Sequence, residues 1–216
     1  SNERKGVIQV SEIMYHPASG WNEYIELVNT GSAPVSLNGW TLRGAVDMDF
    51  TVSNVLSAGE CVLIVGFDPV AEPSVATQFR SLYQVPQGIS LWGPWSVGDS
   101  LGDSAGEVRL RRKVPPPLEE PLFVGLMVED EVVYSAFSPW PVGASGTGSA
   151  IHRLGILKDG NDPSSWIPAT PSAGSEAGGI EGWNRFYFPG GGASSDPMAD
   201  GDHDGLPNRI EYLLGR

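Results

Sequence analysis

The sequence is poor in cysteine and in basic residues, and both shortages limit what the protein can be. Its 216 residues include one cysteine, Cys61, so no disulfide can form within the chain. The 13 Lys and Arg residues are outnumbered by 26 Asp and Glu residues, which gives a formal net charge of −13. Binding to nucleic acid or to anionic lipid depends on cationic side chains that neutralise phosphates, so we expect neither partner.

Long apolar segments and catalytic motifs are also missing from the sequence. No apolar run approaches the roughly 20 residues of a membrane-spanning helix, and no signal peptide stands at the start; we expect the chain to be a piece of a longer protein. His16 and His152 stand alone, without a Ser/His/Asp arrangement or a paired-His zinc spacing. A small hydrolase that uses scattered carboxylates is therefore only a remote alternative.

Glycine and proline are abundant, and they separate many short apolar segments. The 28 Gly and 18 Pro residues predict frequent turns and no long helices. This pattern favours an all-β sandwich or barrel rather than βαβ units, with a loop at residues 68–88 that contains one possible helical turn at 78–83. Cys61 and Trp40 are expected in the core. We predict strands at residues 7–14, 23–29, 35–37, 40–42, 50–52, 61–65, 89–92, 107–110, 123–128 and 132–134.

Near the C-terminus, oxygen-bearing residues recur at the spacing of a calcium loop. Calcium takes six to eight hard oxygen ligands, and a 12-residue loop supplies them from positions 1, 3, 5, 7, 9 and 12, with Gly at position 6 for the sharp turn. Gly205 occupies that turn position and His203 a non-ligand position. The loop predicts Ca²⁺ as the cofactor, against a solvated acidic turn as the alternative. The predicted ligands are Asp200, Asp202, Asp204, Leu206 through its carbonyl, Asn208 and Glu211.

The residues after this loop predict a short helix, and the residues before it predict a linker. Pro207 suits the first turn of a helix, and an apolar stripe follows it at helical spacing. Gly, Ser, Ala and Pro dominate the stretch that precedes the loop. We therefore expect a β-sandwich at 6–175, a linker at 176–195 and a calcium loop with its exit helix at 196–216. The loop resembles the extracellular calcium motifs of dockerins and thrombospondin type 3 repeats, which implies a role in folding, spacing or attachment.

Three groups of segments together resemble a lamin tail domain, over roughly residues 6–175. They lie at residues 10–31, at 35–65 and at 106–171, and they include Val-Ser-Glu-Ile-Met-Tyr-His-Pro from Val10, Asn-Glu-Tyr-Ile-Glu-Leu-Val-Asn from Asn22 and Leu-Asn-Gly-Trp from Leu37. The resemblance implies an immunoglobulin-like β-sandwich with no catalytic residues to carry over. Bacterial members of that family are accessory modules of secreted or surface proteins. We therefore expect a monomeric, non-catalytic module at the bacterial cell surface or outside the cell, with a protein or polysaccharide partner there.

Trp92, Trp95 and Trp140 lie in loop-like segments rich in Gly and Pro. They could form an aromatic platform, which would make the chain a carbohydrate- or polymer-binding module. They could instead fold over the ends of the sandwich, and this interpretation is favoured.

Three charged clusters have weaker interpretations. Arg109 and residues 111–113 form the one basic cluster, which is expected to be a solvated strand face. Asp99, Asp103 and Glu107 could form a second cation site or lie in turns, and the sequence leaves this open. Residues 129–131 are expected at a charged hairpin tip.

Overall fold

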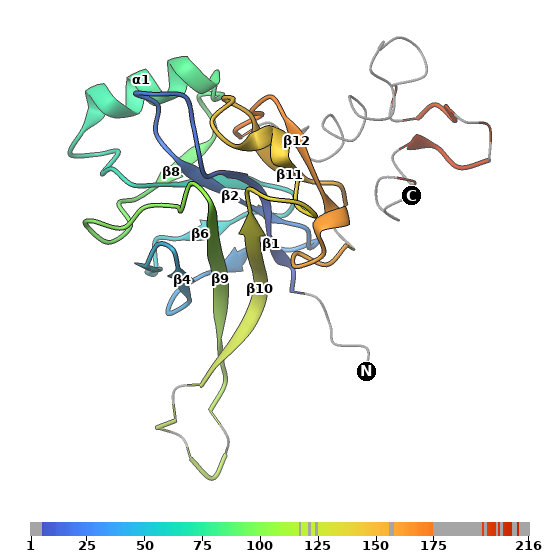
Figure 1. The fold of residues 1–216 in the computed structure, drawn as a ribbon. Helices are drawn as coiled ribbons and strands as arrows, with labels where there is room; N and C mark the ends of the chain where they lie inside the picture. Colours follow the sequence, from blue (N-terminus) through green and yellow to red (C-terminus); the bar gives the residue numbers. More distant parts are fainter. Residues whose placement is uncertain are drawn as a thin grey trace.

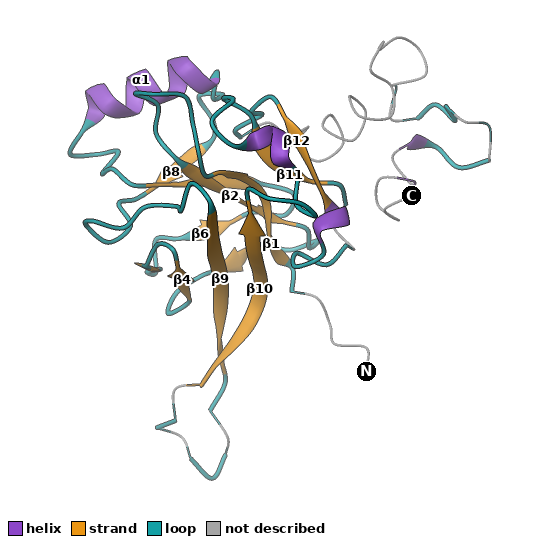
Figure 2. Ribbon diagram, viewed as in Figure 1, coloured by secondary structure: helices purple, strands orange, loops and turns teal. Residues whose placement is uncertain are grey.

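The computed structural model describes residues 6–116, 118–120, 122–123, 125–155, 158–174, 196, 198–201, 203, 205–208 and 211. Its main body consists of two β-sheets that face each other, with one α-helix on the outer side of the larger sheet (Figures 1 and 2). The sequence-based prediction of an all-β, immunoglobulin-like sandwich is confirmed.

Within the described residues, ten strands form the two main sheets and two more form a short ribbon. The larger sheet has the order β12-β11-β1-β2-β7-β8, with β1 (Ile8–Met14), β2 (Tyr24–Asn29), β7 (Cys61–Val65), β8 (Ser90–Trp92), β11 (Ala150–Arg153) and β12 (Trp166–Ala169). The smaller sheet has the order β10-β9-β4-β5, with β4 (Thr41–Gly44), β5 (Met48–Asp49), β9 (Ala105–Val114) and β10 (Gly125–Ser135). The ribbon pairs β3 (Val35–Ser36) with β6 (Val55–Leu56), and the helical elements are α1 (Pro73–Tyr83) and the 3-10 turns η1 (Val142–Ala144) and η2 (Pro163–Ser165).

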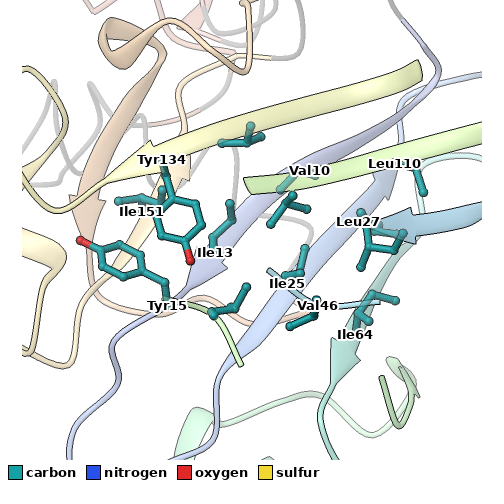
Figure 3. Close-up of a cluster of buried hydrophobic side chains, with 14 of the residues drawn as sticks. Val10, Ile13, Tyr15, Ile25, Leu27, Val46, Ile64, Leu110, Tyr134 and Ile151 are labelled. Carbon is teal, nitrogen blue, oxygen red and sulfur yellow. The ribbon is translucent and has the colours of Figure 1, made fainter. Parts of the chain in front are cut away.

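The larger sheet is buried on both faces. Ile13 and Ile25 are cross-strand partners that point into the core between the sheets (Figure 3). The next pair, Met14 and Tyr24, points the opposite way and packs with Phe79 of α1. Because successive residues of a strand alternate between faces, a strand covered on both sides needs apolar residues at nearly every position.

The segment between β7 and β8 differs from the sequence-based prediction. An 11-residue helix, α1, replaces the expected loop with one turn. Pro73 occupies its first turn, where a missing N–H costs no hydrogen bond. Phe79 and Tyr83 are its buried residues, four positions apart on one face.

This helix joins two parallel strands, which the sequence argued against. β7 and β8 pair in parallel, with Leu63 opposite Leu91, so β7, α1 and β8 form a single βαβ unit in an otherwise antiparallel fold. Parallel neighbours need a crossover connection, and the helix provides it. Within the described residues no helix is long and apolar enough to cross a membrane.

The hairpin of β9 and β10 is the longest feature of the fold, and it projects beyond the sandwich (Figure 1). The prediction that residues 129–131 form its tip is wrong, because these residues lie in the middle of β10. Glu129 and Asp130 instead accept hydrogen bonds from the backbone N–H groups of Ile8 and Val10 in β1. Two carboxylates of the smaller sheet therefore satisfy backbone N–H groups of the larger sheet. These N–H groups lie next to an irregularity in the pairing of β1 with β2, between Val10 and Glu12.

Cys61 and Trp40 are buried, at 4% and 8% exposure, as the sequence predicts.

Candidate functional site

Part of the predicted calcium loop lies within the described residues, and that part is closed by hydrogen bonds. The N–H of Gly205 donates to Oδ2 of Asp200 at 3.0 Å. The N–H of Asn208 donates to the carbonyl of Ala199 at 2.7 Å, which brings position 9 of the loop beside the residue that precedes the loop. Gly205 has a φ of +94°, the left-handed conformation that its turn position requires. The backbone thus curves as the spacing of the sequence predicts.

Two features of the side chains in this loop bear on the predicted cation site. Oδ1 of Asp200 is buried and makes no hydrogen bond within the described residues. Asn208 and Glu211 are also buried, with exposures of 0% and 6%, which is unusual for residues of an acidic loop. His203 is exposed, as expected for a non-ligand position.

Several predictions for this region lie outside the described residues. Asp202 and Asp204 are among them, as are the linker and most of the exit helix. Leu206 is described and half-buried. The N–H of Glu211 donates to the carbonyl of Pro207 at 3.1 Å, a helical hydrogen bond that begins where the sequence expects the helix to begin. The calcium site therefore stays a prediction.

A second polar site, which sequence reasoning missed, lies on the outer face of the larger sheet. Glu12, Glu26 and His152 stand side by side on β1, β2 and β11, as the strand registers show. All three are buried, with exposures of 0%, 2% and 1%. Nε2 of His152 lies 3.4 Å from Oε1 of Glu12. We call these three residues the buried carboxyl cluster.

The chain segment that follows β12 covers this cluster and is hydrogen-bonded to it. Ser172 donates to both oxygens of Glu12, from its N–H at 3.1 Å and from its hydroxyl at 2.9 Å. The N–H of Gly174 donates to Oε2 of Glu26 at 2.7 Å. The hydroxyl of Tyr24 donates to Glu12, and that of Ser11 donates to Glu26. The cluster therefore anchors residues 172–174 on the sheet.

Burial dominates the electrostatics of the two glutamates. Desolvation raises the pKa of Glu12 to about 7, although hydrogen bonds from Tyr24 and Ser172 act in the opposite direction. Desolvation and the charge of Glu12 together raise the pKa of Glu26 to about 8. Such pKa values suit general acid-base chemistry, but both carboxyl groups are covered and engaged with the chain itself. The arrangement is built to hold a segment in place.

The three tryptophans of the predicted platform are mostly buried. Trp95 and Trp140 are 5% and 8% exposed, and both belong to the core between the sheets. Trp140 packs on Trp166, with ring centroids 6.2 Å apart. Trp92 is half-buried and lines a cleft of about 540 Å³ together with hydroxyl and carboxyl groups. One indole ring, rather than three, remains for contact with a ligand on this surface.

The acidic residues near position 100 divide between two places. Asp99 and Asp103 line a pocket of about 430 Å³ with His16 and Glu23. Glu107 instead forms an ion pair with Arg109 at 2.6 Å. Among the residues that the structure describes, no group of three or more His, Cys, Asp or Glu side chains is arranged to hold a metal ion.

The basic cluster is a strand face, as predicted. Arg109 also pairs with Glu131, and Arg112 pairs with Glu129 at 3.0 Å. Arg111 and Lys113 make no ion pair within the described residues.

Comparison with known families agrees with this fold. Residues 1–107, just under half of the 216, match the family model described as Lamin Tail Domain. No curated protein matches the chain. The matched residues carry β1 to β8 and the start of β9, while β10, β11 and β12 complete the same two sheets. The match makes the first half of the chain similar to lamin tail domains.

Proposed function

We propose that the chain is a non-catalytic binding and tethering module of a larger protein at the bacterial cell surface or outside the cell. The match to the lamin tail domain supports the binding role. The net charge of −13 suits a solvated exterior where divalent cations are plentiful. Its partner is a protein or a polysaccharide.

The second half of this proposal is that Ca²⁺ stiffens residues 196–216, which we call the C-terminal junction. One observation carries it: Oδ1 of Asp200 is buried without a hydrogen bond, in a loop whose spacing supplies further oxygen ligands. A buried carboxylate oxygen without a partner is costly, and a cation removes that cost. Asp200, Asn208 and Glu211 would hold the ion, with Asp202, Asp204 and the carbonyl of Leu206 as further ligands. The ion would bring the carboxylates together without mutual repulsion.

Thermal unfolding in excess EDTA and in millimolar calcium tests the calcium site. We expect calcium to raise the unfolding midpoint, since a ligand stabilises the state that binds it. Glu211→Gln should abolish that rise and the calorimetric heat of binding. Glu119→Gln, at an exposed position of the hairpin loop, is the matched control and should keep both. An unchanged midpoint with no heat of binding would leave residues 200–211 as an acidic turn only.

A second candidate function is carbohydrate binding, and the cleft beside Trp92 favours it. Sugar rings stack on indole faces, and their hydroxyls bond to polar side chains around the ring. Thr51, Ser53, Asn54 and Asp49 supply such groups in this cleft. Trp92→Ala should then abolish retention of the protein on an insoluble neutral polysaccharide, such as chitin or cellulose. Absence of retention of the unmodified chain on either material would remove this candidate.

A further inference from the structure

The tip half of the β9–β10 hairpin extends past the body of the protein. β4 pairs with β9 only between Val108 and Arg111. Beyond Arg111 the hairpin continues as β9 and β10 alone, to Val114 opposite Gly125, and Figure 1 shows it projecting from the sandwich. We call the described residues from 111 to 128 the hairpin arm. A ribbon of two strands is only marginally stable in water and gains from a third strand.

Apolar side chains are exposed along this arm. Leu126, Met127 and Val128 follow one another in β10 and are 43%, 51% and 50% exposed. Leu118 and Leu122, in the loop between the strands, are 100% and 94% exposed. Three consecutive exposed apolar residues occupy both faces of the strand, which is uncommon on a protein surface without a partner.

β10 is also the last strand of its sheet, and only its body half is protected. Asp130 is engaged by Arg153 and by the N–H of Val10. The N–H of Val133 donates to Oδ1 of Asn161 at 2.7 Å, which blocks the edge there. Proteins normally guard an edge with charges, bulges or covering loops. Residues 126–128 carry apolar side chains where such a guard would stand.

The charge of the paired strands of the arm, at residues 111–114 and 125–128, indicates the kind of segment that fits its edge. Val128 is the register partner of Arg111, and Leu126 is the partner of Lys113. Cross-strand partners share a face, so two cations lie behind the apolar edge. Neither forms an ion pair within the described residues, although the whole chain has a net charge of −13. Strands lie roughly 5 Å apart, so long side chains can reach an acidic residue on an added strand.

We propose that the free edge of β10 at residues 125–128 binds an extended acidic segment of a partner protein, which adds a strand to the sheet. Main-chain hydrogen bonds would supply affinity, and alternate apolar and acidic side chains would supply specificity. This proposal rests on the proposed binding role and names the surface and the chemistry of the partner. A second copy of the chain is a poorer fit, because both copies carry the same large negative charge.

Fluorescence polarisation with two labelled peptides tests the proposal. One peptide alternates valine with glutamate, and the other alternates valine with lysine. We expect the glutamate peptide to bind and the lysine peptide not to bind. Val128→Lys and Arg111→Glu should each weaken binding about tenfold or more, as expected when an edge contact or a complementary charge is lost. Val97→Lys, at a loop residue that is 99% exposed, is the matched control and should leave binding unchanged.

Three outcomes would overturn the proposal: no binding of the glutamate peptide, equal binding of both peptides, or full binding by Val128→Lys. Sedimentation at rising protein concentration tests whether a second copy of the chain binds this edge instead. A dimer that Val128→Lys converts to monomer would assign the edge to a second copy and overturn the proposal. The calcium response distinguishes failure of the peptide-binding proposal from failure of the proposed calcium site. Val128→Lys should keep the calcium-induced rise in midpoint, and Glu211→Gln should keep the peptide affinity.

Discussion

The buried carboxyl cluster predicts that the protein loses stability as the pH rises from about 5 to about 8.5. The ordinary pKa of both glutamates is 4.5, and in the fold it is about 7 for Glu12 and about 8 for Glu26. The folded state therefore retains protons that the unfolded chain has already released. For a raised pKa, the stabilisation is complete below the unfolded value and is lost as the pH rises through the folded value. This is the reverse of the usual behaviour of salt-bridged carboxylates.

The size of the effect follows from the shift in pKa. Each unit is worth about 1.4 kcal/mol, so the rise of the Glu12 pKa from 4.5 to about 7 corresponds to about 3 kcal/mol. The shift of Glu26 is larger but includes the charge of Glu12, so the two values are not additive. A total loss on the order of 4 kcal/mol is a large part of the 5 to 15 kcal/mol that stabilises a typical domain.

Urea denaturation followed by tryptophan fluorescence, at a series of pH values, measures this loss. The variant Glu26→Gln isolates the contribution of Glu26 to this loss of stability, because the amide resembles the protonated carboxyl group in shape and carries no charge. We expect the variant to match the parent protein near pH 5.5 and to exceed it by about 2 kcal/mol near pH 8.5. The decrease of the unfolding free energy with pH should become less steep in the variant, by the amount that corresponds to about one fewer proton released on unfolding.

Two results would refute this reasoning. If stability rises with pH across this range, other groups outweigh the cluster. If the curves of Glu26→Gln and the parent stay parallel, the proton on Glu26 is not retained in the fold. The groups that face the two carboxyls are Tyr24, Tyr83 and His152. Because both proteins contain these residues, the difference between the curves isolates Glu26.

Three further substitutions test the fold itself, each by urea denaturation. Asp130→Ala should cost about 3 to 5 kcal/mol, because it leaves the buried Arg153 without its carboxylate; a loss below about 1 kcal/mol would contradict this. Gly44→Ala should destabilise by about 1 to 3 kcal/mol, because φ is +124° and a Cβ would lie 2.2 Å from the carbonyl oxygen of Glu107. Ile25→Ala should cost about 2 to 5 kcal/mol, since the side chain is fully buried between the sheets.

The strands could be predicted from sequence because alternation and turn residues are local properties. The strands predicted at 35–37 and 40–42 are present as two separate strands, and Gly39 between them has a φ of +76°. The partners of these two strands are not a local property. β3 pairs with β6 in the short ribbon, whereas β4 pairs with β5 and β9 in the smaller sheet. Which strands pair depends on contacts between distant segments, and alternation carries no information about them.

The helix α1 and the buried carboxyl cluster were missed for the same reason. α1 contains Ser, Thr and Gln among its apolar residues, and its helical state is favoured by packing on Tyr24 and Val65. Glu12 and Glu26 look like solvent-facing residues of alternating strands. The elements that bury them, α1 and residues 172–174, lie far along the chain. Both strands are buried at nearly every position although each contains polar residues, so the sequence pattern alone did not indicate burial on both faces.

The buried carboxyl cluster and the proposed calcium loop should respond to pH in opposite directions. Residues 172–174 are held by carboxyl groups that keep their protons up to about pH 7. The proposed calcium loop needs carboxylates that have lost theirs, and calcium affinity therefore rises with pH. The anchored residues 172–174 and the calcium-bound loop should therefore coexist in neutral to mildly acidic surroundings. Above pH 8 the loop should keep its calcium, while the cost of burying two charged carboxylates lowers the stability of the fold.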